Sequence, residues 1–251
     1  MTPATSQRGE RLEANGGKNV ALSLAFNADC MEAMRQFPDG FFDLAVVDPP
    51  YGGGATDTKL HGATDGRFGN KGSAFEKYRE IKAERRGCGH NKYDVKITEW
   101  DIPPTQEYFS ELFRVSKNQI IWGGNYFLLP PTRCFLIWRK LTISESFSMA
   151  MAEYAWTSFN GNAKVFECAP QDSKRFHPTQ KPKALYDWIY KLYAKHGMKI
   201  LDTHLGSGSS RIAAYDAGLD FWGYEIDKTY FDLQEERFEK HSAQQNLFLM
   251  D

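Results

Sequence analysis

Four consecutive residues, Asp48-Pro49-Pro50-Tyr51, combine groups that could hold and activate a weakly nucleophilic amine. The Asp48 carboxylate can accept one N–H of an amino group and the Pro49 carbonyl the other, while Pro50 makes the loop rigid. Tyr51 can stack on an aromatic base. An exocyclic amine reacts poorly because its lone pair is delocalised into the ring. Two acceptors that favour a more tetrahedral nitrogen, aligned with a sulfonium methyl group, address that difficulty.

The context of this tetrapeptide favours a functional loop over its alternative, a proline-rich turn with an aromatic plug. Residues 41–47 are apolar in a pattern that predicts a strand buried on both faces. The two prolines cannot continue the hydrogen-bonding ladder, so the loop begins where the strand ends. Open parallel sheets place their active sites at such strand ends.

A second group of residues predicts a nucleotide-binding βαβ unit in the last third of the chain. A strand over 199–202 ends in Asp202, and Gly206 and Gly208 permit a tight turn into a helix through residue 217. Glu225 ends the next strand, where it can accept hydrogen bonds from two ribose hydroxyls. The pattern favours adenosine binding but does not separate NAD from S-adenosylmethionine. Arg211 stands where a fuller dinucleotide motif would have its third glycine.

The remaining periodicities predict an α/β domain around these two loops. Residues 52–98 are too long for an ordinary connection and are interpreted as an insertion, and residues 140–176 as a second one. Further strands are predicted over 22–26, 120–122, 134–138 and 151–159, where Glu153 lies among apolar and aromatic neighbours; helices are predicted over 30–37, 105–116, 183–195 and 228–240.

Composition narrows the class of protein. The 251 residues fit one domain over 20–251 behind a loose tail over 1–19, and no apolar run approaches the length of a membrane span. We therefore expect a cytoplasmic protein. The 4 cysteines form no CxxC pair, so no metal site is predicted.

The net charge of −1 conceals an uneven distribution. Residues 59–96 hold 10 Lys or Arg against 5 Asp or Glu, whereas residues 216–251 hold 3 against 9. The basic segment could neutralise DNA phosphates, although two ordinary solvated faces would look the same. The candidate DNA-binding residues are Arg67, Lys71, Lys82, Arg85, Arg86 and Lys92.

In five ordered motifs the chain resembles the DNA amino-methyltransferases, which act on N6 of adenine or N4 of cytosine. It is most similar to the permuted subgroup, in which the catalytic motif precedes the cofactor motif. The motifs are Asn27-Ala28-Asp29-Cys30, Asp48-Pro49-Pro50-Tyr51, His177-Pro178-Thr179-Gln180-Lys181-Pro182, Asp202 to Ser209, and Gly223-Tyr224-Glu225-Ile226-Asp227.

The resemblance assigns roles residue by residue. Asp29 matches the acid at the adenine of S-adenosyl-L-methionine, and Glu225 matches the ribose-binding acid. Thr179 and Lys181 match the stretch that helps to hold the methionine end of the cofactor. The catalytic residues are those of the Asp48–Tyr51 loop. The loop around the methionine moiety contains Asp202, His204, Gly206, Ser207, Gly208 and Ser209.

One departure from the family concerns this glycine loop. The family usually has Asp-Pro-Phe before its glycines, whereas this chain has Asp202-Thr203-His204. We interpret His204 as a neutral, packed imidazole rather than a catalytic group, because methylation of this kind needs no strong general base.

The resemblance implies a Rossmann-like methyltransferase fold with a mixed seven-stranded sheet, helices on both faces and a permuted motif order. It implies methyl transfer to DNA, with the target base flipped into the loop, in a bacterial or phage-encoded protein. Asp48 favours adenine N6 because Ser is commoner among cytosine-N4 members. The alternatives are cytosine N4, RNA or protein glutamine, or a non-catalytic nucleic-acid-binding relative. A homodimer is left open, as is the insertion that reads the bases.

Overall fold

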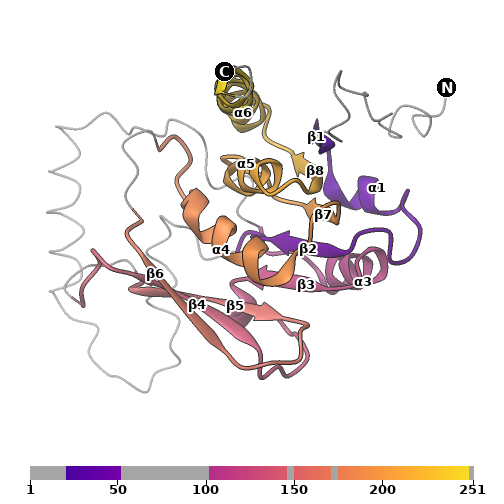
Figure 1. Cartoon of the computed structure of the whole chain (residues 1–251). Helices are drawn as coiled ribbons and strands as arrows, with labels where there is room; N and C mark the ends of the chain where they lie inside the picture. The colour runs from indigo at the N-terminus through magenta and orange to yellow at the C-terminus, as the bar shows by residue number, and fades with distance from the viewer. Residues whose placement is uncertain (1–20, 52–101, 146–149, 171–174, 249–251) are drawn as a thin grey trace, which may run out of the picture.

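The sheet and the helices on both of its faces confirm the predicted fold class (Figure 1). The structure is a computed structural model that describes residues 21–51, 102–145, 150–170 and 175–248. Within these residues, eight strands form one mixed sheet in the order β1-β8-β7-β2-β3-β5-β4-β6. The strands are β1 (Ser23–Asn27), β2 (Leu44–Val47), β3 (Gln119–Trp122), β4 (Phe135–Lys140), β5 (Ala152–Thr157), β6 (Lys164–Cys168), β7 (Lys199–Asp202) and β8 (Asp220–Glu225).

Five neighbouring strands, β1, β8, β7, β2 and β3, run parallel to one another. β5 is antiparallel to both β3 and β4, and β6 returns parallel to β4. The described helices are α1 (Cys30–Met34), α3 (Gln106–Val115), α4 (Lys183–Tyr193), α5 (Ser209–Asp216) and α6 (Lys228–Phe248), with a short 3-10 turn, η4 (Gly124–Tyr126).

The central strand β2 separates two apolar cores, as its uninterrupted hydrophobic sequence predicts. Leu44 and Val46 pack in one core with residues of α4 and α5. Ala45 and Val47 point to the opposite face and pack with residues of α1 and α3. All four strand residues are at most 1% exposed. The loop that follows β2 therefore starts from a strand that is held on both faces.

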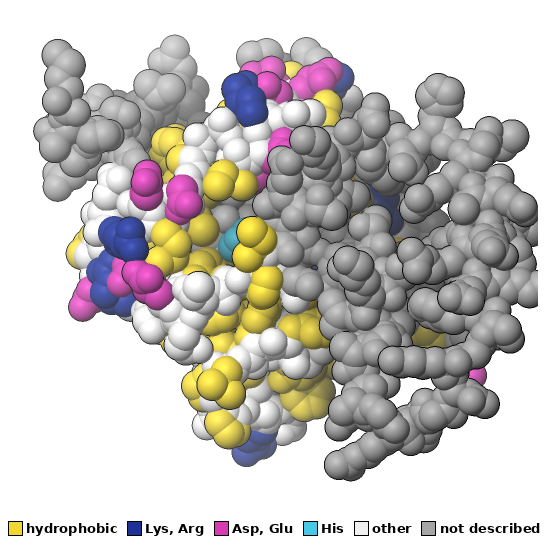
Figure 2. All heavy atoms as spheres, turned by 180° about the vertical axis from the view of Figure 1, so that it is seen from behind, with side chains coloured by type: hydrophobic (Ala, Val, Ile, Leu, Met, Phe, Trp, Pro, Cys, Tyr) yellow, Lys and Arg dark blue, Asp and Glu magenta, His cyan; other side chains and the backbone are white. Residues whose placement is uncertain are grey.

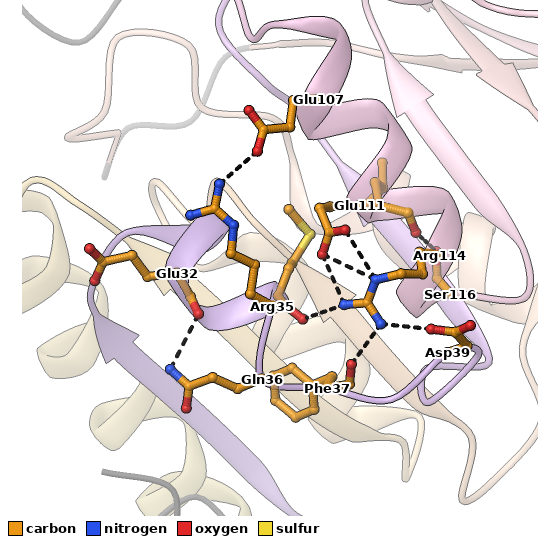
Figure 3. A network of polar contacts seen from close by, with 11 residues as sticks. Glu32, Arg35, Gln36, Phe37, Asp39, Glu107, Glu111, Arg114 and Ser116 are labelled. Carbon is orange, nitrogen blue, oxygen red and sulfur yellow. Dashed lines mark hydrogen bonds and ion pairs between the residues drawn. The ribbon is translucent and has the colours of Figure 1, made fainter. Parts of the chain in front are cut away.

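Helix α1 is fastened to α3 by the guanidinium of Arg114 (Figure 3). This group donates to the carbonyl oxygens of Met34 and Phe37 at 3.1 and 2.9 Å, and to Asp39 at 2.8 Å. Glu111 holds it from within α3. The carbonyls at the end of a helix lack partners inside that helix, so Arg114 caps α1 from its neighbour.

One feature differs from the sequence-based expectations. The described residues form eight strands rather than seven, because β6 lies in the segment over 140–176 that was interpreted as an insertion. Among the described strands β6 is at one end of the sheet and pairs with β4. Half-buried and exposed residues alternate along it, so its sequence lacks the apolar run of a central strand. In the described part of the chain, no helix is both long and apolar enough to cross a membrane.

Candidate active site

Most of the predicted site residues lie at the carboxyl ends of parallel strands, which is one end of the sheet. β2 pairs with β7 through Leu44 and Ile200, so Asp48 follows one strand and Asp202 ends its neighbour. β1 pairs with β8, with Asn27 opposite Glu225. The Asp48–Tyr51 loop and the glycine loop are thus brought to the same end of the parallel strands, as expected for open α/β sheets.

The Asp48 carboxylate is held at both oxygens. The Tyr51 hydroxyl donates to Oδ1 at 2.6 Å, and the Lys181 ammonium donates to Oδ2. Burial, and then the Asp48 charge, raise the pKa of Tyr51 well above its ordinary value, so the phenol stays protonated and can donate. Each carboxylate oxygen has a second lone-pair site, so Asp48 can still accept an N–H bond from a ligand.

The position of the Tyr51 ring depends on Gly123, which was not predicted as part of the site. Gly123 follows β3 with φ of +67°, and a Cβ placed there would lie 2.0 Å from Cε1 of Tyr51. Tyr51 also stacks on Tyr126 of η4, with ring centroids 4.9 Å apart. Tyr126 is 62% exposed, so two aromatic rings stand together at the edge of the sheet.

Lys181 lies deeper than its assigned role suggests. Its side chain is 3% exposed and is bonded to both Asp48 and Glu153, the latter at 3.1 Å. Its ammonium lies over the Trp122 ring, 5.3 Å from the centroid. The structure therefore brings Lys181 to the catalytic loop, and its contact with the methionine end of a cofactor stays a prediction.

Glu225 presents a carboxylate that fits a pair of ribose hydroxyls. Its two oxygens accept from the backbone amides of Gly206 and Asp227 at 2.8 and 2.9 Å. These bonds fix the carboxylate and leave acceptor sites on each oxygen. The side chain is half-buried, so it is oriented by the protein and still reachable. The acceptor sites of Glu225 at this strand end therefore fit the hydroxyl groups of a nucleoside.

The glycine loop is built around buried polar contacts. Gly208 has φ of +70° and begins α5, whose first amide groups are free to face a ligand. Asp202 accepts from the Ser210 hydroxyl and from the His204 amide, and burial raises its pKa to about 7. Ser207 and Ser209 are buried and are held by Arg237 of α6, so they anchor the loop to that helix.

His204 is a packed, neutral imidazole, as we interpreted it. Its Nδ1 lies 2.9 Å from the Thr203 hydroxyl, which is 2.6 Å from the buried hydroxyl of Tyr108. The imidazole also meets the Tyr108 ring edge to face. Burial lowers the pKa of His204 to about 4, so the ring is uncharged at neutral pH.

The other two predicted cofactor residues are engaged locally. Asp29 caps α1, with its Oδ1 accepting from the amides of Met31 and Glu32 at 2.7 and 3.3 Å. Thr179 lies against His177, whose Nδ1 is 3.2 Å from the threonine hydroxyl. Asp29 remains exposed at the end of β1, beside the strand that carries Glu225, so its carboxylate can still meet a ligand.

Comparison with known families decides the class of protein. A family model described as DNA methylase matches residues 103–236, which are 134 of the 251 residues. The chain belongs to the DNA methylase family. The model is that of the N6/N4 class. In this chain the loop after β2, with Asp48, precedes the glycine loop after β7, which is the order of the permuted subgroup.

Known relatives and structures agree with this family. The Type II methyltransferase M.HpaI of Haemophilus parainfluenzae is 25% identical over 84% of this chain and 73% of its own length. The M1.HpyAVI–SAM complex has a TM-score of 0.50 at 16% identity, over 85% of this chain and 97% of that chain. The cytosine-N4-specific PvuII DNA methyltransferase has a TM-score of 0.51 at 11% identity, over 91% and 94%. These two structures support the fold of the DNA methylase.

The predicted DNA-binding residues of this DNA methylase lie outside the described residues, since all of them fall in 52–101. On the face seen in Figure 2, the described part of the chain shows scattered basic side chains among acidic and hydrophobic ones rather than a continuous basic area. The assignment of phosphate contacts to Arg67, Lys71, Lys82, Arg85, Arg86 and Lys92 therefore stays a prediction.

Two charged residues next to the site were not predicted as part of it. Glu153 of β5 bonds Lys181, and Lys140 at the end of β4 bonds Glu153 at 2.5 Å. The sequence position of Glu153 could have predicted a buried ion pair, because an acid inside an apolar strand is rarely buried without a partner. The sequence position of Lys140 could not, since a lysine that ends a strand usually lies in solvent.

Proposed function

We propose that this DNA methylase transfers a methyl group from S-adenosyl-L-methionine to the N6 amino group of adenine in DNA. The observation that carries the proposal is the Asp48 carboxylate, fixed at both oxygens and adjacent to the glycine loop. An amino group placed against this loop would meet Asp48 and the Pro49 carbonyl as its two acceptors.

The bound cofactor would supply an electrophilic methyl group. Glu225 and Asp29, at neighbouring strand ends, would hold its ribose and adenine. Asp202, His204 and the residues from Gly206 to Ser209 would surround its methionine part, together with Thr179 and Lys181. The complex of M1.HpyAVI with SAM supports this choice of cofactor.

The target base would leave the duplex to reach the loop, because the amino nitrogen of a stacked base is inaccessible there. Tyr51 and the exposed Tyr126 offer aromatic surface to the flipped base. Phosphate contacts from the basic segment over 59–96 would position the duplex. Because the proposed substrate is intracellular DNA, we propose that the protein acts in the cytoplasm.

The choice of adenine rests on Asp48, because Ser is commoner at this position among cytosine-N4 enzymes. Cytosine N4 is the second candidate, and the structural similarity to the cytosine-N4-specific PvuII enzyme favours it. The mechanism is the same for either base, since both present an exocyclic amine.

Product analysis separates these candidates. The protein would be incubated with labelled S-adenosylmethionine and mixed-sequence DNA, and the digested nucleosides separated. We expect label in N6-methyladenine. Label in N4-methylcytosine would keep the mechanism and correct the base. Transfer to RNA or protein, with none to DNA, would contradict the proposed substrate.

The role of Asp48 is tested by the Asp48→Ala variant. We expect the methyl-transfer rate to fall by about 10³-fold, because an acceptor preorganised for the reacting group is lost. Cofactor affinity, measured by calorimetry, should stay within about threefold, since Glu225 and the glycine loop are separate from Asp48. The control is Asp232→Ala, which removes an exposed carboxylate paired with Lys228. Equal rates in the two variants would contradict the role.

A further inference from the structure

Four side chains of alternating charge form a row that begins at the Asp48 carboxylate and ends at Lys140. Lys181 bonds Asp48 and Glu153, and the other oxygen of Glu153 bonds Lys140 at 2.5 Å. The two lysine side chains are 3% and 7% exposed, and those of Asp48 and Glu153 are 17% and 23% exposed. The charges of these four side chains sum to zero. The role proposed for Asp48 accounts for Asp48 alone and not for the other three.

The four residues come from four different elements. Asp48 follows β2, and Lys181 precedes α4. Glu153 of β5 lies opposite Trp138 of β4 in the antiparallel register. The Lys140 amide donates to the Met151 carbonyl at 2.8 Å, which fixes the end of β4 against β5. The position of Glu153 is therefore set by the sheet and not by the loop that carries Asp48.

The charges of Lys181 and Glu153 are both maintained by this arrangement. Burial disfavours the ammonium of Lys181, but Asp48 and Glu153 outweigh burial and raise its pKa. Burial likewise disfavours the Glu153 carboxylate, but Lys181 and Lys140 lower its pKa. Both groups are thus ionised at neutral pH. Replacing buried ion pairs by apolar residues is often neutral or stabilising, so a contribution to stability does not explain why these four charged residues are present.

We propose that Glu153, itself held by Lys140, is a positioning residue that seats Lys181 against the catalytic carboxylate of Asp48. The inference rests on the proposed function. Lys181 and Tyr51 together fix the plane of the Asp48 carboxylate, because one donor binds each oxygen. Glu153 accepts a second hydrogen bond from the Lys181 ammonium, which fixes the position of this lysine. Lys181 then occupies only one lone-pair site of Asp48, and the remaining sites can accept from the amino group.

The test compares Glu153→Gln with Glu167→Gln. Glu167 is the matched control because it pairs with Arg139 on the same sheet, at 2.7 Å, but is 48% exposed. The first readout is the NMR titration of Lys181 in the ligand-free protein, with ¹³C-labelled lysine assigned through Lys181→Arg. The charged groups that act on Lys181 are Asp48 and Glu153, and the nearby His177, whose pKa is lowered to about 4 by burial, is uncharged over this titration. We expect the Lys181 midpoint to fall by about one pH unit or more in Glu153→Gln and to stay in the control.

The second readout is the single-turnover rate of methyl transfer at saturating cofactor and DNA. We expect Glu153→Gln to lower this rate by about 10²-fold, since small misplacements of a catalytic group have effects of that size. The cofactor KM should change much less than this rate, because Glu153 could reach the cofactor only through Lys181, while Glu225 and the glycine loop keep their contacts. An unchanged Lys181 midpoint, or a shifted midpoint with a wild-type rate, would overturn the inference.

A double variant, Lys140→Met with Glu153→Gln, guards against a simple folding defect. It removes one charge of each sign, so the remaining Lys181–Asp48 pair is still neutral overall. We expect it to melt near the wild-type temperature and to remain as slow as Glu153→Gln. Recovery of the wild-type rate would overturn the inference, because Glu153 would then only balance Lys140.

If the wild-type protein methylates neither base, the proposed function fails, while the Lys181 titration still decides whether Glu153 holds this lysine.

Discussion

Gly123 sets the place of Tyr51, the proposed catalytic tyrosine, through its lack of a side chain. Its backbone is left-handed, and the Tyr51 ring occupies the space that a Cβ would need. A methyl group there adds backbone strain and pushes the ring away. Tyr51 is one of the two groups that fix the Asp48 carboxylate, so the effect of such a change should reach the reaction.

The prediction for this residue is that Gly123→Ala lowers the methyl-transfer rate by about 10²-fold through displacement of Tyr51. The control is Gly197→Ala, because Gly197 has φ of +77° and nothing within 4 Å of the position of a Cβ. Both variants should lose about 1–2 kcal/mol of unfolding free energy to left-handed strain, measured by urea titration. If both kept the same rate of methyl transfer, Gly123 would have no role beyond its turn.

His204 makes stability depend on pH. Its folded-state pKa of about 4 lies below its ordinary value of 6.5, so the unfolded chain binds the proton first on acidification. Its contribution is therefore complete above pH 6.5 and is lost as the pH falls towards 4. His177 adds a contribution of the same sign. Asp202, whose pKa is raised to about 7, contributes with the opposite sign, since its stabilisation is lost as pH rises.

We predict that His204→Phe, which introduces the residue usual in the family, reduces the loss of stability between pH 6.5 and pH 4. One such group contributes a slope of up to about 1.4 kcal/mol per pH unit, and this slope should disappear. Chemical denaturation at several pH values measures it, and comparison with the wild type cancels the contributions of His177 and Asp202. An identical pH dependence in the variant would show that His204 titrates normally.

Among the elements, α1 is short and depends on α3. It spans Cys30–Met34, its first turn is capped by Asp29, and Arg114 donates to the carbonyl of its last residue, Met34, and to that of Phe37 just beyond it (Figure 3). A helix of this length is unstable alone because too few hydrogen bonds form for the residues that are ordered. The position of the proposed adenine-binding acid thus depends on a contact made by another helix.

Arg114→Ala should therefore lower the unfolding free energy by about 2 kcal/mol, as expected for hydrogen bonds that involve a charged group. Arg35→Ala is the control, because Arg35 bonds only the exposed Glu107 of α3 among the contacts described and is itself 55% exposed. That control should lose less than about 1 kcal/mol. Equal losses in a guanidinium titration would mean that capping by Arg114 adds nothing to an ordinary surface pair.

At the scale of the whole molecule, a neutral protein has to bind a polyanion. The prediction is that neutralising Lys82, Arg85 and Arg86 with glutamine makes DNA binding less dependent on salt. The slope of log K against log salt should fall by about 0.9 for each phosphate contact that is lost. Fluorescence anisotropy over a range of salt concentrations measures it. Lys228→Gln with Lys240→Gln is the control, since these α6 lysines pair with acids on their own helix. An unchanged slope in the triple variant would remove the basic segment from the interface.

Local structures and the chemistry of single loops could be predicted from the sequence. The apolar run before Asp48 predicted the buried strand β2, and the glycines before α5 predicted the turn and the helix, because these signals depend on neighbouring residues. Ordered motifs were enough to predict the family and the fold. The strand β6 was missed because its alternating half-buried and exposed pattern is weak.

Only the tertiary structure decided which side chains meet. The parallel pairing of β2 with β7 places Asp48 beside the glycine loop, and no local pattern encodes that register. The environment of Lys181 was decided in the same way, since its two acids come from β5 and from the loop after β2. The physical reason is that burial makes an unpaired charge costly, so the identity of the partner follows from the packing of distant strands and not from spacing along the chain.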